Sequence, residues 1–191
     1  MIKRLFHIIR IALVNSNRKA HIHVPWNNHL DRKSKILAYP GSNITLGDNV
    51  TLRSNPLGYH CGMPFSTTLL ADTDGASIRI GSNTRVNGAY IHAKLKISIG
   101  NNCVIASGVN IIDSNGHMVI SLDRTKGRDI PEPIVIGNNV WIATNAIVLK
   151  GVTIGDNSIV SAGSVVCRGD YPANCILQGN PAIVVKELRN Q

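Results

Sequence analysis

The feature that most constrains this chain is an aliphatic residue that recurs every six positions. Stepping by six places Ile or Val at Ile136, Ile142, Val148, Ile154, Val160 and Val166. A helix repeats its apolar residues every 3.6 positions and a half-buried strand every two, so neither explains this period. A chain that turns a corner every six residues does, because each flat wall then directs one aliphatic side chain inward. The pattern is typical of a hexapeptide β-helix, a solenoid of short parallel strands.

A short motif marks the corners of the expected solenoid. It reads aliphatic, any residue, aliphatic, Gly, any residue, Asn, and its five copies occupy 44–49, 78–83, 97–102, 134–139 and 152–157. Gly and Asn accept positive φ at low cost, so we expect both at tight corners. Gly137 and Gly155 are 18 residues apart, which is one triangular coil of three hexads. The longer intervals after Gly47 and Gly100 must hold a further coil or a loop outside the stack.

The period divides the chain into three parts. We expect a basic helical or irregular segment at 1–40, a β-helix domain at 41–180 and a tail at 181–191 that ends in a short helix. Loops interrupt the period near 53–66 and 117–132. Residues 2–14 place apolar side chains on one face of a helix. The two ends are expected to cover the ends of the solenoid.

Composition agrees with a narrow solenoid and narrows the function classes. Only 4% of the 191 residues are aromatic, and the net charge is +9. Residues 1–35 hold eight basic residues against one acidic residue. A helix packed on the solenoid is the simpler interpretation, and peripheral membrane contact through residues 1–20 is the alternative. Nucleic acid is not an expected partner, because the basic residues are not interleaved with aromatic ones.

Cysteines and hydropathy indicate where the protein works. The four cysteines form no CxxC pair, which favours reduced thiols in a cytoplasmic protein. No run of 18 apolar residues predicts a spanning helix. We therefore expect a cytoplasmic protein, which the basic N-terminal segment could hold at the inner face of the membrane.

One histidine stands where the regular pattern breaks. His117 follows Ile111 by six residues, where the next inward aliphatic residue is due, and precedes a charged segment at 123–129. An unperturbed histidine side chain has a pKa of about 6.5, which suits a general base. On position alone, a surface histidine at the base of a loop is the simpler interpretation. His92, six residues after Val86, is the rival candidate.

The second half of the chain resembles a known family. The segments 113–117, 134–142, 151–158, 162–166 and 179–181 are similar to the hexapeptide-repeat acyltransferases of the maltose, galactoside and nodulation-sugar O-acetyltransferase type. The resemblance implies an all-β fold, a left-handed parallel β-helix of hexapeptide repeats with short helical N- and C-terminal segments. The hand comes from the resemblance alone, because parallel crossovers are usually right-handed.

The resemblance also implies an activity. It indicates a homotrimer whose sites lie between subunits and that transfers acetyl from acetyl-CoA to a sugar hydroxyl. The acceptor would belong to a bacterial surface polysaccharide or its precursor. His117 would be the general base that takes the proton of the attacking hydroxyl. Asn87, Trp141 and Asp113 would bind the acceptor.

The acetyl-CoA contacts that the resemblance implies fall near the C-terminal end. They are Thr144, Ala162, Ser164, Cys167, Arg168 and Lys186, and no metal is required. This chain has Cys167 and Arg168 where the sugar enzymes have Thr and Lys, and Ile183 where they have Arg. Residues 1–40 do not match the segment that shapes the maltose and galactoside pocket, so a different acceptor is expected.

Other functions stay open at this point. The same base and donor would serve an N-acetyltransferase of an amino-sugar. Serine acetyltransferases carry a large helical N-terminal domain, which this chain lacks, and so fit less well. A zinc hydrase of the γ-carbonic anhydrase kind needs three converging histidines, and the repeat offers two at most. A non-catalytic β-helix scaffold is the last alternative.

Overall fold

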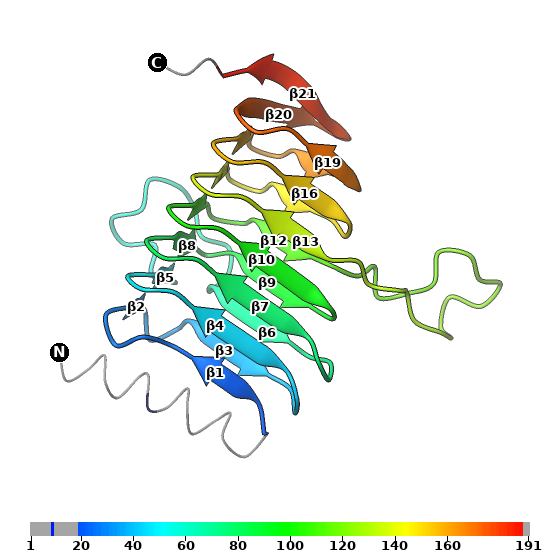
Figure 1. Ribbon diagram of the computed structural model, residues 1–191, viewed down its shortest axis with the longest axis horizontal. Coiled ribbons are helices and arrows are strands. Elements are labelled where there is room, and N and C mark those ends of the chain that lie inside the picture. The colour runs from blue at the N-terminus through cyan, green and yellow to red at the C-terminus, as the bar shows by residue number, and fades with distance from the viewer. Residues whose placement is uncertain (1–8, 10–18, 189–191) are drawn as a thin grey trace.

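The computed structural model describes Ile9 and residues 19–188, which form a three-walled prism of parallel strands (Figure 1). Sheet A consists of β1 (His21–His23), β4 (Asn43–Leu46), β7 (Ser77–Ile80), β10 (Lys96–Ile99), β13 (Ile134–Ile136), β16 (Val152–Ile154) and β19 (Gly169–Tyr171). Sheet B consists of β2 (His29–Leu30), β5 (Thr51–Arg53), β8 (Arg85–Asn87), β11 (Val104–Ile105), β14 (Trp141–Ile142), β17 (Ile159–Val160), β20 (Cys175–Gly179) and β21 (Ala182–Glu187). Sheet C consists of β3 (Lys35–Ala38), β6 (Thr68–Ala71), β9 (Tyr90–Ala93), β12 (Asn110–Ile112), β15 (Ile147–Val148) and β18 (Val165–Val166).

Successive hexads lie on successive walls, as the six-residue period predicts. Ile136, Ile142 and Val148 fall on β13, β14 and β15, one in each sheet. Each strand pairs in register with the strand one coil away, for example Ile99 with Ile136. The predicted fold class, an all-β left-handed parallel β-helix, is confirmed.

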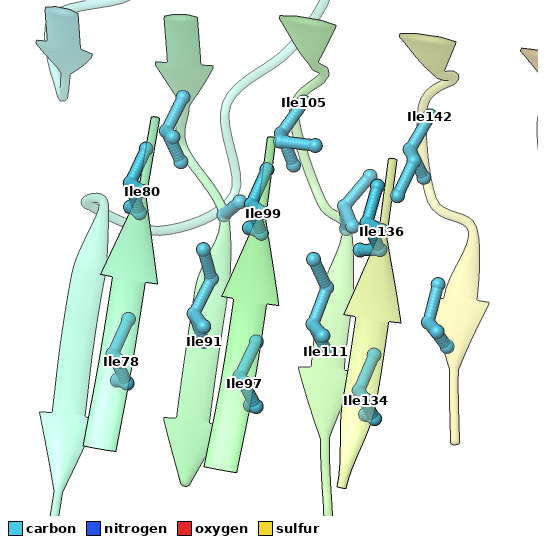
Figure 2. Packing of buried hydrophobic residues seen from close by; sticks show 14 of the residues in the cluster. Ile78, Ile80, Ile91, Ile97, Ile99, Ile105, Ile111, Ile134, Ile136 and Ile142 are labelled. Carbon is cyan, nitrogen blue, oxygen red and sulfur yellow. The ribbon is translucent and has the colours of Figure 1, made fainter. Parts of the chain in front are cut away.

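The core is a set of aliphatic stacks along the axis of the prism. Figure 2 shows Ile78, Ile97 and Ile134 in one row and Ile80, Ile99 and Ile136 in the next. Nearly all of these side chains are at most 2% exposed, and the buried core contains no Phe, Tyr or Trp among the described residues. Burying one such side chain contributes about 1.5–3 kcal/mol, so the stacks are the main source of stability. The narrow prism explains the low aromatic content.

Gly and Asn of the corner motif have different roles, which corrects the expectation that both supply positive φ. The motif asparagines have φ between 53° and 60°: Asn49, Asn83, Asn102, Asn139 and Asn157. The motif glycines do not have positive φ. They are needed for close approach: a Cβ on Gly100 would lie 2.5 Å from the carbonyl oxygen of Gly137 in the next coil.

Both ends of the solenoid differ from the prediction. We expected the coils to begin near residue 41, but β1 pairs with β4 and starts the stack at His21. The C-terminal tail was expected to form a short helix. Instead β21 turns back and pairs antiparallel with β20, which extends sheet B. The helix predicted at 2–14 lies almost wholly outside the described residues.

Two loops leave the stack at different edges. Residues 54–67 connect β5 to β6 at the edge between sheets B and C, and residues 113–133 connect β12 to β13 at the edge between sheets C and A. In Figure 1 the first, in cyan, lies behind the strands on one side, and the second, in yellow-green, projects on the other. We call them the B/C loop and the C/A loop.

Candidate active site

A groove of about 980 Å³ lies on the outer face of sheet B. Its floor is two columns of outward-facing residues that run along the axis, one residue per coil. The first column contains Thr51, Arg85, Val104, Trp141, Ile159 and Ile176, and the second contains Arg53, Asn87, Ala106, Ala143 and Ser161. Each column follows from the strand alternation, which sends every second side chain outward.

The two ends of the groove differ in polarity and in the size of the side chains that line them. Toward the C-terminal end, Ala106, Ala143 and Ser161 form a trench of small side chains beside the taller column that holds Trp141, which is 48% exposed. Toward the N-terminal end the floor is polar and carries Arg53 and Arg85. Asn87 lies between the two regions. The groove therefore offers an apolar, narrow half and a cationic half.

The B/C loop forms one wall of the groove and is fixed by specific contacts. The backbone amide of Ser107 donates to the Tyr59 hydroxyl at 3.3 Å, and Ser107 Oγ donates to the Gly62 carbonyl at 2.6 Å. Burial raises the pKa of Tyr59, against the opposing effects of the Ser107 bond and nearby Arg53. Gly88 has φ +55°, and a Cβ there would collide with Met63, so glycine lets the loop close on the coil.

His117 stands away from this groove. Its side chain is exposed at the start of the C/A loop, and no hydrogen bond or ion pair to it is found among the described residues. The groove lies on sheet B, whereas this loop leaves the edge between sheets C and A. A single chain therefore does not bring His117 together with Asn87 and Trp141.

The base of the C/A loop is nevertheless held firmly. Asp129 accepts a hydrogen bond from the Asn115 amide at 2.8 Å and pairs with Lys150 Nζ at 2.7 Å. Glu132 forms ion pairs with Lys150 and with Arg168, whose Nε donates to it at 2.8 Å. The Asn115 bond and Lys150 hold the pKa of Asp129 below its usual range. This network fixes the backbone two residues before His117.

Asp113, which is predicted to bind the acceptor, has a structural role in its own chain. It is fully buried, and its carboxylate accepts hydrogen bonds from the backbone amides of Lys94, Leu95 and Lys96 at 2.7–2.8 Å. Its oxygens are occupied by the preceding coil, so the side chain does not face the groove. It closes the turn between β9 and β10.

The residues predicted to contact acetyl-CoA divide between two edges. Thr144 and Ala162 line the groove at the edge between sheets B and C. Ser164 is buried beside them, and its Oγ accepts a hydrogen bond from the Gly179 amide at 3.2 Å. Cys167 and Arg168 lie at the C/A edge, and Arg168 is engaged with Glu132. Lys186 is exposed on β21.

His92, the rival candidate, is part of an ion-pair cluster on sheet C. Its Nε2 lies 3.0 Å from Asp72 Oδ2, and Lys94 Nζ lies 3.2 Å from the other carboxylate oxygen. Although burial of Asp72 opposes it, bonding to His92 and Lys94 lowers the pKa of this carboxyl. The arrangement gives His92 a structural role in this cluster.

Sequence reasoning missed the cationic half of the groove. Arg53, Arg85, Tyr59 and His60 line it, and none was singled out. The signal was present for one of them, because Arg85 is two residues before Asn87 and must share its outward face. The B/C loop residues gave no such signal, since a loop has no period.

In the part of the chain that the structure describes, no group of three or more His, Cys, Asp or Glu side chains is arranged to hold a metal ion. Nor does that part contain a helix with the length and hydropathy needed to span a membrane.

Comparison with known proteins gives a consistent set of relatives. The model of the family described as bacterial transferase hexapeptide (six repeats) matches residues 133–168. Galactoside O-acetyltransferase of Escherichia coli K12 is 39% identical over 118 residues, which is 61% of this chain and 57% of the relative. A putative lipopolysaccharide biosynthesis O-acetyl transferase, WbbJ, of the same organism is 35% identical over 124 residues, covering 60% of this chain and 62% of the relative. The chain thus spans less than two thirds of the length of these curated relatives.

Solved structures agree in fold. A maltose O-acetyltransferase from Clostridium difficile 630 has a TM-score of 0.51 at 30% identity, with 77% of this chain and 67% of that chain covered. A galactoside acetyltransferase in complex with coenzyme A has a TM-score of 0.58 at 25% identity, with 94% of this chain and 70% of that chain covered. Both are similar to this chain over most of the prism.

Proposed function

Because the chain belongs to the family of hexapeptide-repeat transferases, we propose that it is an O-acetyltransferase that moves acetyl from acetyl-CoA to a sugar hydroxyl. The observation that carries this proposal is the groove on sheet B. Asn87 lies between a narrow trench of small residues, which Trp141 borders, and a polar, cationic recess. One half suits an extended apolar donor arm, and the other suits a carbohydrate.

The narrow half fits the pantetheine arm of the donor. Small side chains at Ala106, Ala143 and Ala162 leave the strand edges and corner backbone open to a ligand. When bound, acetyl-CoA supplies the acetyl group as an activated thioester. Thr144 and Ala162 would line the arm, and Lys186, which forms no ion pair with another described residue, would meet phosphate. Arg168 could do so only by exchanging its partner Glu132.

His117 completes the site from a neighbouring subunit in this proposal. A homotrimer would set the C/A edge of one prism against the sheet B groove of the next, since a closed ring repeats one contact between two different surfaces. His117 would then face Asn87 and Trp141 of the neighbour. Its exposed imidazole is free of other partners among the described residues, as a base that must accept a proton requires. A positioned general base is typically worth about 10²–10⁴-fold in rate.

The acceptor is proposed to be a sugar of a bacterial surface polysaccharide or its precursor. The relative named for lipopolysaccharide biosynthesis supports this class, and the open groove would admit a chain as well as a single sugar. We place the reaction in the cytoplasm. Contact with the membrane through residues 1–20 is part of the same proposal, although most of that segment lies outside the described residues.

The test is acetyl transfer by the wild type and His117→Ala to a panel of sugars and bacterial glycans, with product analysis by NMR. We expect the variant to lose about 10²–10⁴-fold in kcat while it still binds acetyl-CoA in calorimetry. His23→Ala, an exposed histidine on sheet A, is the matched control and should keep full activity. Undiminished turnover by His117→Ala would remove this residue from the mechanism.

A further inference from the structure

Two arginines occupy adjacent rungs of the groove floor. Arg53 ends β5 and Arg85 begins β8, and the register pairs Thr51 with Arg85 and Arg53 with Asn87. The strands are about 4.8 Å apart and residues two apart along a strand are about 6.6 Å apart, so the two Cα atoms are roughly 8 Å apart. Both side chains point out of the same face, and both line the groove. One small anion can therefore meet both guanidinium groups.

Neither arginine has an acidic partner. Among the described residues, no carboxylate lies within ion-pair distance of Arg53 or Arg85, whereas Arg168 and Lys150 on other walls are paired. The groove lining contains no Asp or Glu. Asp31 borders the adjoining recess, but its Oδ2 accepts hydrogen bonds from the backbone amides of Ser54 and Asn55. Two guanidinium groups therefore share a recess with one carboxylate, Asp31, which forms an ion pair with neither of them.

Arg53 is also held in place. Its guanidinium carbon lies 5.8 Å from the centre of the Tyr59 ring, a cation–π distance, and the Tyr59 hydroxyl is bound by Ser107. A guanidinium that is already oriented loses less freedom when it binds a ligand. The B/C loop therefore builds one side of a recess for a negative group.

The recess adjoins the proposed acceptor residues. Arg85 is two residues before Asn87 in β8, and the column above it continues through Val104 to Trp141. A sugar that contacts Asn87 would place its substituents within reach of both arginines. Planar guanidinium groups bind carboxylate and phosphate oxygens in pairs, with stronger hydrogen bonds than neutral groups form.

We infer that the acceptor is an acidic sugar, one that carries a carboxylate or phosphate oxyanion held by Arg53 and Arg85 while a nearby hydroxyl is acetylated. This inference rests on the proposed function and specifies its substrate class. It assigns the two arginines to recognition of the acceptor, apart from the donor and from the proton transfer.

The first test measures binding without acetyl-CoA, so that it does not depend on turnover. Calorimetry compares N-acetylneuraminic acid with its methyl ester, glucuronic acid with glucose, and galacturonic acid with galactose. Glucose 1-phosphate and galactose 1-phosphate form the phosphate arm. We expect at least one acidic sugar to bind about tenfold or more tightly than its neutral counterpart, and the preference to fall as salt rises. If the sugars with a carboxylate show the larger preference over their neutral counterparts, the recess binds a carboxylate. If the sugar phosphates show it, the recess binds a phosphate.

Charge-removing variants then locate the effect. Arg53→Gln and Arg85→Gln should each weaken binding of the acidic sugar about 10- to 100-fold and leave the neutral sugar unchanged. Arg79→Gln, an exposed arginine on sheet A, is the matched control. Circular dichroism and thermal melting confirm that each variant is folded, and Arg85→Lys should restore part of the preference.

Two results would overturn the inference: equal binding of acidic and neutral sugars in every pair, or equal weakening of both by the arginine variants. The proposed function is judged separately, by acetyl transfer. Transfer to neutral sugars with no charge preference would reject the acidic acceptor and keep the enzyme. Charge-selective binding with no transfer to any sugar would reject the acetyltransferase activity and keep the recognition of an acidic sugar by the two arginines.

Discussion

The carboxylate of Asp129 accepts a hydrogen bond from the backbone amide of Asn115, at 2.8 Å, across the base of the C/A loop. Lys150, in the next coil along the chain, binds the same carboxylate at 2.7 Å. Asn115 is two residues before His117. The bond therefore ties the candidate base to a rigid coil, although the rest of the loop extends away from the prism.

Removing this tie should impair catalysis more than folding. We predict that Asp129→Asn lowers kcat about 10- to 100-fold, because a displaced base loses its alignment with the hydroxyl, and leaves the KM for acetyl-CoA unchanged. Steady-state kinetics check this. Asp123→Asn is the matched control: Asp123 lies in the same loop, its carboxylate pairs with Thr125 and Lys126, and the variant should keep its activity. Equal effects of the two substitutions would show that the anchor does not position His117.

Acid should release the same anchor. The pKa of Asp129 is lowered in the folded protein, first by the Asn115 bond and then by Lys150. A carboxyl with a lowered pKa stabilises the fold above its unfolded value, about 3.9, and the contribution is lost as pH falls through the folded value. We therefore predict that the Asn115 amide signal in NMR is constant from neutral pH to about pH 4 and shifts below it. Asp129→Asn should remove that transition; a transition that persists in the variant belongs to another group.

Asp113 gives a prediction about stability. Asp113→Ala removes the charged acceptor of three part-buried backbone amides, and a hydrogen bond to a charged group contributes about 1.5–3 kcal/mol. Urea unfolding should show a loss of roughly 3 kcal/mol or more. Asp156→Ala removes an exposed carboxylate that accepts from the Asn138 amide and should cost less. A stable Asp113→Ala protein with a raised acceptor KM would instead restore Asp113 as a substrate ligand.

The corner glycines give a prediction about packing between coils, because their backbone φ values alone would allow alanine. Gly100→Ala places a Cβ against the Gly137 carbonyl, and overpacking of this kind costs about 1–3 kcal/mol. Gly62→Ala has nothing within 4 Å and no positive φ, so its free energy of unfolding should equal that of the wild type. Thermal and urea unfolding compare the two. No loss in Gly100→Ala would mean that the coils can separate locally without cost.

Much of the fold could be predicted because its core residues recur in the sequence at a fixed spacing. Ile136, Ile142 and Val148 show the three walls directly, since they recur at six-residue spacing and each is buried on a different wall. The first coil was missed because β1 contributes a single apolar residue, Ile22, between two histidines. The strand β21 was missed because its pairing with β20 depends on a reversal of the chain that has no six-residue period.

The candidate site was less predictable because it depends on surfaces that the period does not describe. Asn87 and Trp141 were expected, and the structure places both on one groove. Arg53 and Arg85 gain their significance from the B/C loop, whose path follows from contacts such as that of Tyr59 with Ser107. The structural role of Asp113 was not predicted, because its hydrogen bonds go to backbone amides of the preceding coil. In the proposed function His117 acts together with a neighbouring chain, and contacts between chains leave no period in the sequence.

The central claim is that each active site takes His117 from one subunit and Asn87 from the next. The most direct measurement mixes inactive His117→Ala and Asn87→Ala proteins, unfolds and refolds them together, and assays acetyl transfer. Random trimers would then hold one intact site in about four, so activity should recover to about a quarter of the wild type. Activity that stays at the level of the separate variants, with mixed trimers verified by mass spectrometry, would contradict a site shared between subunits.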